Sequence, residues 1–127
     1  MKVRVTEILS IEGNLFVDFL SPAGSGNALW VGYRPTVWEE LDVEFDLDEI
    51  FSWGKSLTSS SRTSPLIKVI NGTTHVTAEI AQNADEEWVV LKLEDSMILI
   101  ELKESITQQS GFVEVRTNSI RLYPTNI

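Results

Sequence analysis

The most regular feature of the chain is the stretch 41–48, where apolar and acidic residues alternate without interruption. A period of two is typical of a β-strand with one apolar face and one polar face. The residues expected in the core are Leu41, Val43, Phe45 and Leu47, and those expected in water are Asp42, Glu44, Asp46 and Asp48. The pattern therefore predicts a strand that carries a row of carboxylates on its solvent face.

Shorter apolar runs, many of them alternating, cover most of the remaining chain. Turn-forming residues such as Glu12-Gly13-Asn14 and Asn71-Gly72 separate these runs. The predicted strands lie at 3–8, 15–20, 28–33, 66–70, 75–80, 88–93, 97–102, 112–116 and 120–122, with loops at 21–27 and 55–65 and a turn at 83–87. The run 97–102 is apolar on both faces, which favours a central strand covered on both sides.

No stretch shows the 3.6-residue periodicity of an amphipathic helix. We predict an all-β fold with little or no helix: a small antiparallel β-barrel or sandwich, either OB-like (the oligonucleotide/oligosaccharide-binding barrel) or SH3-like, with insertions. The 127 residues suffice for one core, so residues 1–127 are expected to form a single domain. The serine-rich segment 55–65 cannot offset its ordering entropy by burial and is expected to be a flexible loop.

The formal net charge of −9 restricts the partners that the protein can attract. Nucleic acids and anionic membranes are polyanions and repel so acidic a chain, whereas a basic protein is attracted to it. Charged residues interrupt the N-terminal segment before a signal peptide could form, and no window holds 18 unbroken apolar residues. We therefore expect a cytoplasmic protein, and the pattern leaves its oligomeric state open.

Catalytic and metal-binding motifs are scarce. The chain has no cysteine, which excludes disulfides, thiolate zinc sites and cysteine nucleophiles. His75 is the only histidine and has no Gly-x-Ser-x-Gly motif beside it, and no glycine-rich phosphate loop is present. Neighbouring carboxylates on one strand face lie ~7 Å apart, too far to bind one metal ion without help. We expect no catalytic residue, no metal and no cofactor.

Aromatic residues are concentrated near the acidic strand. Trp and Tyr side chains anchor protein interfaces, and carboxylates accelerate the approach of a basic partner. The predicted partner-binding residues are Asp42, Glu44, Asp46, Asp48, Glu39, Glu40, Trp30 and Trp38. The competing interpretation of the acidic row is a solvated strand face, on which Lys or Arg residues of neighbouring strands relieve the repulsion.

These observations predict a non-enzymatic domain that binds a basic protein. Its most specific form is a bacterial immunity or inhibitor protein that covers the basic active site of a toxin. The alternative is an OB-like domain that binds an oligonucleotide or oligosaccharide, which a basic concave surface would favour. The third possible function is that of a hydrolase with an unrecognised site. A pocket that brings His75 together with carboxylates would favour this function.

Overall fold

The computed structural model describes residues 1–82 and 86–125, and this part of the chain contains twelve strands and no helix. The strands are β1 (Lys2–Ile11), β2 (Asn14–Ser21), β3 (Gly24–Trp30), β4 (Glu40–Leu47), β5 (Ile50–Phe51), β6 (Leu57–Ser60), β7 (Leu66–Ile70), β8 (Thr73–Gln82), β9 (Trp88–Leu93), β10 (Ser96–Leu102), β11 (Phe112–Thr117) and β12 (Ile120–Pro124). The predicted turn at 83–87 lies partly outside the described residues. No helix among the described residues is long and apolar enough to span a membrane.

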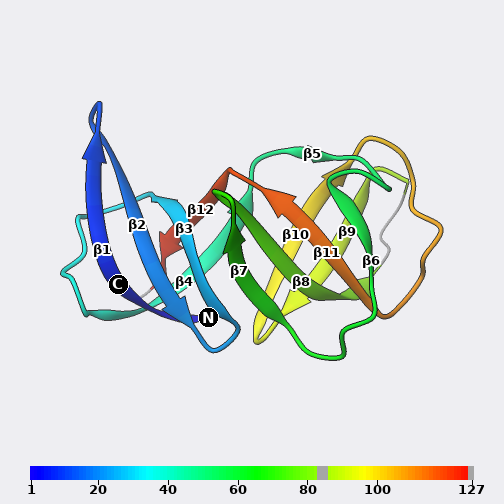
Figure 1. Ribbon diagram of the computed structural model, residues 1–127, viewed down its shortest axis with the longest axis horizontal. Coiled ribbons are helices and arrows are strands. Elements are labelled where there is room, and N and C mark those ends of the chain that lie inside the picture. Colours follow the sequence, from blue (N-terminus) through cyan, green and yellow to red (C-terminus); the bar gives the residue numbers. More distant parts are fainter. Residues whose placement is uncertain (83–85, 126–127) are drawn as a thin grey trace.

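Five of the strands close into a barrel. β1 pairs with β2, β2 with β3, β3 with β12, β12 with β4, and β4 with β1 (Figure 1). β12 thus returns to lie beside β3, which is the Greek-key arrangement of an OB-like barrel. The predicted all-β barrel with insertions is confirmed, with the addition of short parallel pairings such as β3 with β12.

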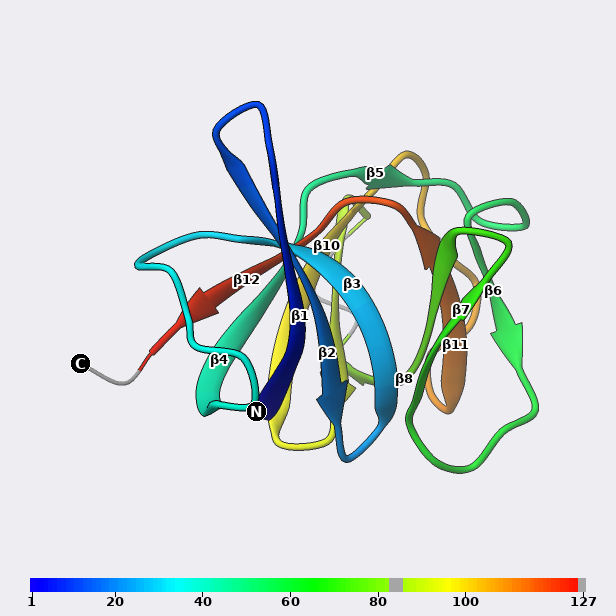
Figure 2. The same cartoon turned by 60° about the vertical axis from the view of Figure 1, so that its left-hand side comes forward.

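The remaining strands form a second group, inserted in the chain between β4 and β12. In this group β6, β11, β8, β9, β10 and β5 follow one another through paired edges, and β7 pairs with β8 (Figure 2). β7 joins the barrel where Ile67 pairs with Gly24 of β3, and β10 packs beside β4. Buried residues of both groups form one hydrophobic cluster.

The acidic strand β4 has the facing that its alternation predicts. Val43, Phe45 and Leu47 are buried, and the ring of Phe45 meets Phe19 of β2 edge-to-face, with ring centroids 5.8 Å apart. Leu41 is partly buried, at the edge of the core. β4 therefore joins the hydrophobic cluster on one face and presents its carboxylates on the other.

The loop predicted at 21–27 is much shorter than expected. β3 begins at Gly24, and only Pro22 and Ala23 separate it from β2. Glycine in a strand often marks a close approach of another group, and a Cβ at Gly26 would stand 2.9 Å from Phe19 Cζ. The glycines that suggested a loop therefore serve close packing within a strand.

The serine-rich segment is also more ordered than its composition suggests, so the prediction of an irregular loop over 55–65 is wrong for Leu57–Ser60. These residues form β6 and pair with β11. Leu57 is fully buried, and Arg116 of β11 donates a hydrogen bond to the carbonyl oxygen of Lys55. Pairing with a distant strand overrides local composition here.

The prediction that 97–102 is a central strand is wrong. β10 pairs with β9 along its length, but on its other edge β5 pairs only with Glu101 and Leu102. Ile98 and Ile100 are buried, whereas Met97 is 61% exposed and Leu99 52% exposed. One of the two apolar faces of β10 therefore lies on the surface.

Candidate functional site

The N-terminal half of the acidic strand is partly neutralised by β1. Lys2 and Arg4 lie opposite Asp42 and Glu40 in the β1–β4 pairing. Lys2 Nζ is 4.0 Å from Asp42 and 3.9 Å from Glu40, and Arg4 Nη2 is 3.3 Å from Glu40. Exposed ion pairs of this kind stabilise little, but they reduce the local negative charge.

The C-terminal half of the strand has a base as well. Arg121 of β12 lies opposite Asp46 and forms an ion pair with Asp48 at 2.8 Å. A hydrogen bond with Tyr123 and the attraction of Asp48 raise the pKa of Arg121, so this guanidinium stays charged. Neither Glu44 nor Asp46 forms an ion pair within the described part of the chain.

Two other carboxylates of this region have structural partners. Glu39 accepts a hydrogen bond from the backbone N–H of Thr36 at 3.0 Å. Glu49 accepts hydrogen bonds from Thr117 Oγ1 and from the N–H of Asn118, and so ties the two ends of the insertion together. Bases from β1 and β12, far away in sequence, thus lie beside the acidic row, as the competing interpretation of a solvated strand face expects.

The structure separates the two predicted tryptophans. Trp30 is only 4% exposed, and its indole N–H donates to the carbonyl oxygen of Tyr33 at 2.7 Å, so the prediction that it contacts a partner is wrong. Trp38 is 62% exposed, with a backbone φ of +72° that bulky residues rarely adopt. Val5 O accepts from its N–H, and Arg4 donates to its carbonyl oxygen at 2.8 Å. Trp38 is therefore held by its backbone while its ring stays at the surface.

Two neighbouring grooves run between β4 and β10, and together we call them the acidic seam. One has a volume of about 470 Å³ and the other about 450 Å³. The acidic residues that line the seam are Asp42, Glu44, Asp46, Asp48, Glu49, Asp95 and Glu101. Exposed apolar side chains line it too, namely Met97, Leu99 and Ile50. No lysine or arginine among the described residues lines either groove, although the Met1 amino group lies 3.6 Å from Asp95.

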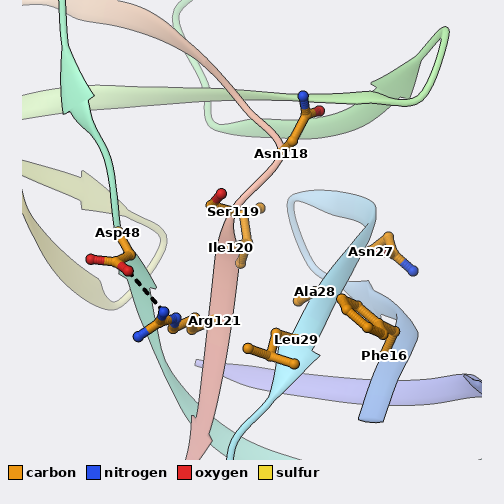
Figure 3. A pocket seen from close by; sticks show the side chains of 9 residues that line it. All are labelled: Phe16, Asn27, Ala28, Leu29, Asp48, Asn118, Ser119, Ile120 and Arg121. Atoms are coloured by element: carbon orange, nitrogen blue, oxygen red, sulfur yellow. Dashed lines mark ion pairs between the residues drawn. The ribbon is translucent and has the colours of Figure 1, made fainter. Parts of the chain in front are cut away.

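A smaller pocket of about 150 Å³ lies on the outer face of the barrel, over β2, β3 and β12. Phe16, Leu29 and Arg121 occupy paired positions on these strands and form one row across it (Figure 3). The Arg121–Asp48 ion pair closes one end, and Asn27 lies toward the other. The pocket combines an aromatic ring with planar polar groups whose charges largely cancel.

His75 lies on the outer face of the second group of strands. Its Nδ1 is 3.0 Å from Glu114 Oε1, and Arg116 Nη1 donates to the same oxygen at 2.8 Å. None of the cavities described above includes these three residues. The cluster joins a histidine to one carboxylate and one arginine, and all three side chains are partly buried.

The cluster of His75, Glu114 and Arg116 makes the free energy of unfolding depend on pH. Burial raises the pKa of Glu114, but the hydrogen bonds and charges of His75 and Arg116 outweigh it and hold the pKa below the ordinary 4.5. Because the folded-state pKa is the lower one, the stabilisation is complete above about pH 4.5 and is lost as pH falls through the folded value. We expect the free energy of unfolding, measured by urea melts, to fall between pH 6 and pH 3 by on the order of 1 kcal/mol more in wild type than in Glu114→Gln.

Glu7→Gln is the matched control for this measurement, because Glu7 is exposed and forms no ion pair among the described residues. It should keep the wild-type dependence on pH. Equal acid sensitivity in wild type and Glu114→Gln would show that the cluster contributes nothing.

The acidic seam contains carboxylates that the sequence predicts to bind a partner, and beside them it contains Met97 and Leu99, which the sequence predicts in the interior. The predicted carboxylates are Asp42, Glu44, Asp46 and Asp48. The missed residues gave one signal: Met97 and Leu99 alternate with isoleucines in a short run that has polar neighbours on both sides. Among the described residues, no three acidic or histidine side chains converge to bind a metal ion. Comparisons of the chain with protein-family models, with curated proteins and with solved structures found no match.

Proposed function

We propose that the protein is a non-enzymatic binding domain whose acidic seam docks a basic protein. The observation that carries this proposal is the lining of the seam, where carboxylates surround exposed apolar side chains without a lysine or arginine. Charged rims mainly govern the approach and selection of a partner, whereas buried apolar contacts slow its release. The seam offers both kinds of contact in one place.

The chemistry of the seam favours lysine and arginine side chains as its ligands. Their aliphatic stems can pack on Met97, Leu99 and Ile50 while their cationic heads reach the carboxylates. The net charge of −9 attracts a basic protein over distances set by the salt concentration. In its most specific form the proposal is an inhibitor, such as a bacterial immunity protein, that covers a basic active site.

Charge reversal within the seam tests the proposal. Glu44 and Asp46 are the best positions, because neither forms an ion pair in the described structure and both side chains point away from the core. The partner is first captured from lysate at low ionic strength and purified. Glu44→Lys with Asp46→Lys should then lower the association rate by about 10-fold or more, and wild-type association should slow as salt rises.

The matched control reverses Glu7 and Glu12 on the β1–β2 hairpin, which changes the net charge by the same amount away from the seam. This variant should associate much faster than the seam variant. An association rate that responds neither to seam reversal nor to salt would sink the proposal.

A second candidate function rests on the pocket of Figure 3. An OB-like barrel with an aromatic ring beside planar polar side chains suits a sugar unit, which stacks on Phe16 and receives hydrogen bonds from Asn27 and Arg121. Acidic residues beside the pocket disfavour an oligonucleotide. NMR titration with an oligosaccharide panel should shift the pocket resonances in wild type and not in Phe16→Ala, whereas titration with single-stranded DNA should leave both unchanged.

A further inference from the structure

The hairpin of β1 and β2 projects beyond the other strands of the barrel (Figure 1). β4 pairs with β1 only from Lys2 to Arg4, and the pairing with β2 shifts by one residue between Val5 and Glu7. Beyond this bulge, no described strand other than β2 pairs with β1. The segment Glu7–Ile11 is therefore an open strand edge.

The hairpin geometry tells which backbone groups point outward from this edge. Glu12 and Gly13 form a two-residue turn with φ of +51° and +82°, as in a type I′ turn. The flanking residues of such a turn form a hydrogen-bonded pair, and the pattern then alternates along the strands. The backbone N–H and C=O groups of Leu9 thus form hydrogen bonds with β2, whereas those of Ile8 and Ser10 point away from β2.

Apart from the bulge and Glu7 at its start, the open edge lacks the features that normally prevent strand addition. Lysine, proline and inward-pointing charges protect natural edges. Lys2 and Arg4 lie on the half of β1 that β4 already covers, but the open half has neither lysine nor proline. Leu9 is 57% exposed, and Ile11 is exposed beside it.

We propose that the open edge of β1 pairs with the same edge of a second copy of this chain. In an antiparallel arrangement centred on Leu9, Ile8 of each copy lies opposite Ser10 of the other. The outward N–H and C=O groups of both residues then form hydrogen bonds in both directions, as a twofold interface requires. Glu7 lies opposite Ile11 of the second copy, so that no carboxylate faces another across the interface.

The geometry also joins apolar surface across the twofold axis. Leu9, Phe16 and Leu29 lie in one row over β1, β2 and β3. Pairing places Leu9 beside Leu9 of the second copy, so that the two rows become continuous. One short strand pair buries little area, so the dimer is weak and reversible.

Cysteine cross-linking tests this arrangement, because the natural chain has no cysteine. Leu9→Cys would face its own copy in a non-hydrogen-bonded pair with Cα atoms ~4.5 Å apart, within the range of a disulfide. The matched control is Leu20→Cys, at an exposed leucine of β2 that lies outside both the open edge and the acidic seam. With oxidised glutathione, Leu9→Cys should form covalent dimer at least about 10-fold faster than Leu20→Cys. Equal rates would overturn the proposal.

Sedimentation over a range of concentrations tests the hydrogen bonds of the edge. Ser10→Pro removes a backbone N–H that points outward and that β2 does not use. Because both copies carry the substitution, each dimer loses two interchain hydrogen bonds. Self-association should weaken roughly 10- to 100-fold in Ser10→Pro and stay unchanged in Ser10→Ala. A wild-type mass that stays at 14.3 kDa up to ~1 mM would also overturn the proposal.

The response to salt separates this interface from the docking of a basic partner. Both copies carry a net charge of −9, so salt screens their repulsion and should strengthen the dimer. Binding of a basic protein in the acidic seam should weaken with salt instead. Self-association that weakens as salt rises would contradict pairing at the β1 edge.

Discussion

Phe45→Ala should lower the free energy of unfolding by about 3 to 5 kcal/mol. Phe45 is buried beneath the acidic row of β4 and packs edge-to-face on Phe19, so truncation removes apolar burial and leaves a cavity. Domains of this size are typically stable by only about 5 to 15 kcal/mol, so the variant should be close to unfolded at moderate urea. Urea melts followed by tryptophan fluorescence provide the measurement.

Glu44→Gln is the control on the same strand. Its side chain points into water, and it forms no ion pair among the described residues. We expect a change of less than about 0.5 kcal/mol, because surface substitutions rarely cost more. Equal effects of the Phe45 and Glu44 substitutions would mean that the register of β4 is wrong.

Gly24→Ala should destabilise the fold by about 3 kcal/mol or more, through backbone strain and steric overlap. Gly24 has a φ of +135°, and a Cβ there would overlap the backbone carbonyl oxygen of Ile67. The contact is the point where β7 pairs with β3 and joins the insertion to the barrel. The substitution should therefore loosen that junction as well as lower the unfolding free energy.

Gly54→Ala separates the two causes. Gly54 also has a positive φ, +86°, but a Cβ there would meet nothing within 4 Å. It should cost only about 1 kcal/mol, the usual cost of a side chain in this backbone region. If thermal melts give both alanine variants the same loss, the close approach at Ile67 contributes nothing to stability.

The strand character of the chain could be predicted from local pattern. Alternation over 41–48 was enough to assign the buried face of β4, because the facing of a strand residue depends only on its position in a period of two. The hairpin turn at Glu12-Gly13 was equally local, since its backbone geometry is a property of those two residues. These inferences needed no knowledge of neighbouring strands.

The identity of the bases that lie beside the acidic row of β4 could not be predicted in this way. The bases beside β4 are Lys2 and Arg4, which precede it by almost 40 residues, and Arg121, which lies near the other end of the chain. A cross-strand neighbour depends on which segments pair, and strand order is not encoded in a period of two. The row of carboxylates in the sequence therefore overstated the charge of the folded surface.

The sequence by itself thus determined an all-β chain, the facing of β4 and an acidic net charge. Only the tertiary structure decided that Trp30 is buried, that serines enter β6, and that Met97 and Leu99 reach the surface at the acidic seam. The physical reason is that burial depends on contacts between distant segments, such as the closure of the barrel by β12 and the placement of β10 beside β4. An apolar run looks the same whether its second face is covered by another layer or left open to water.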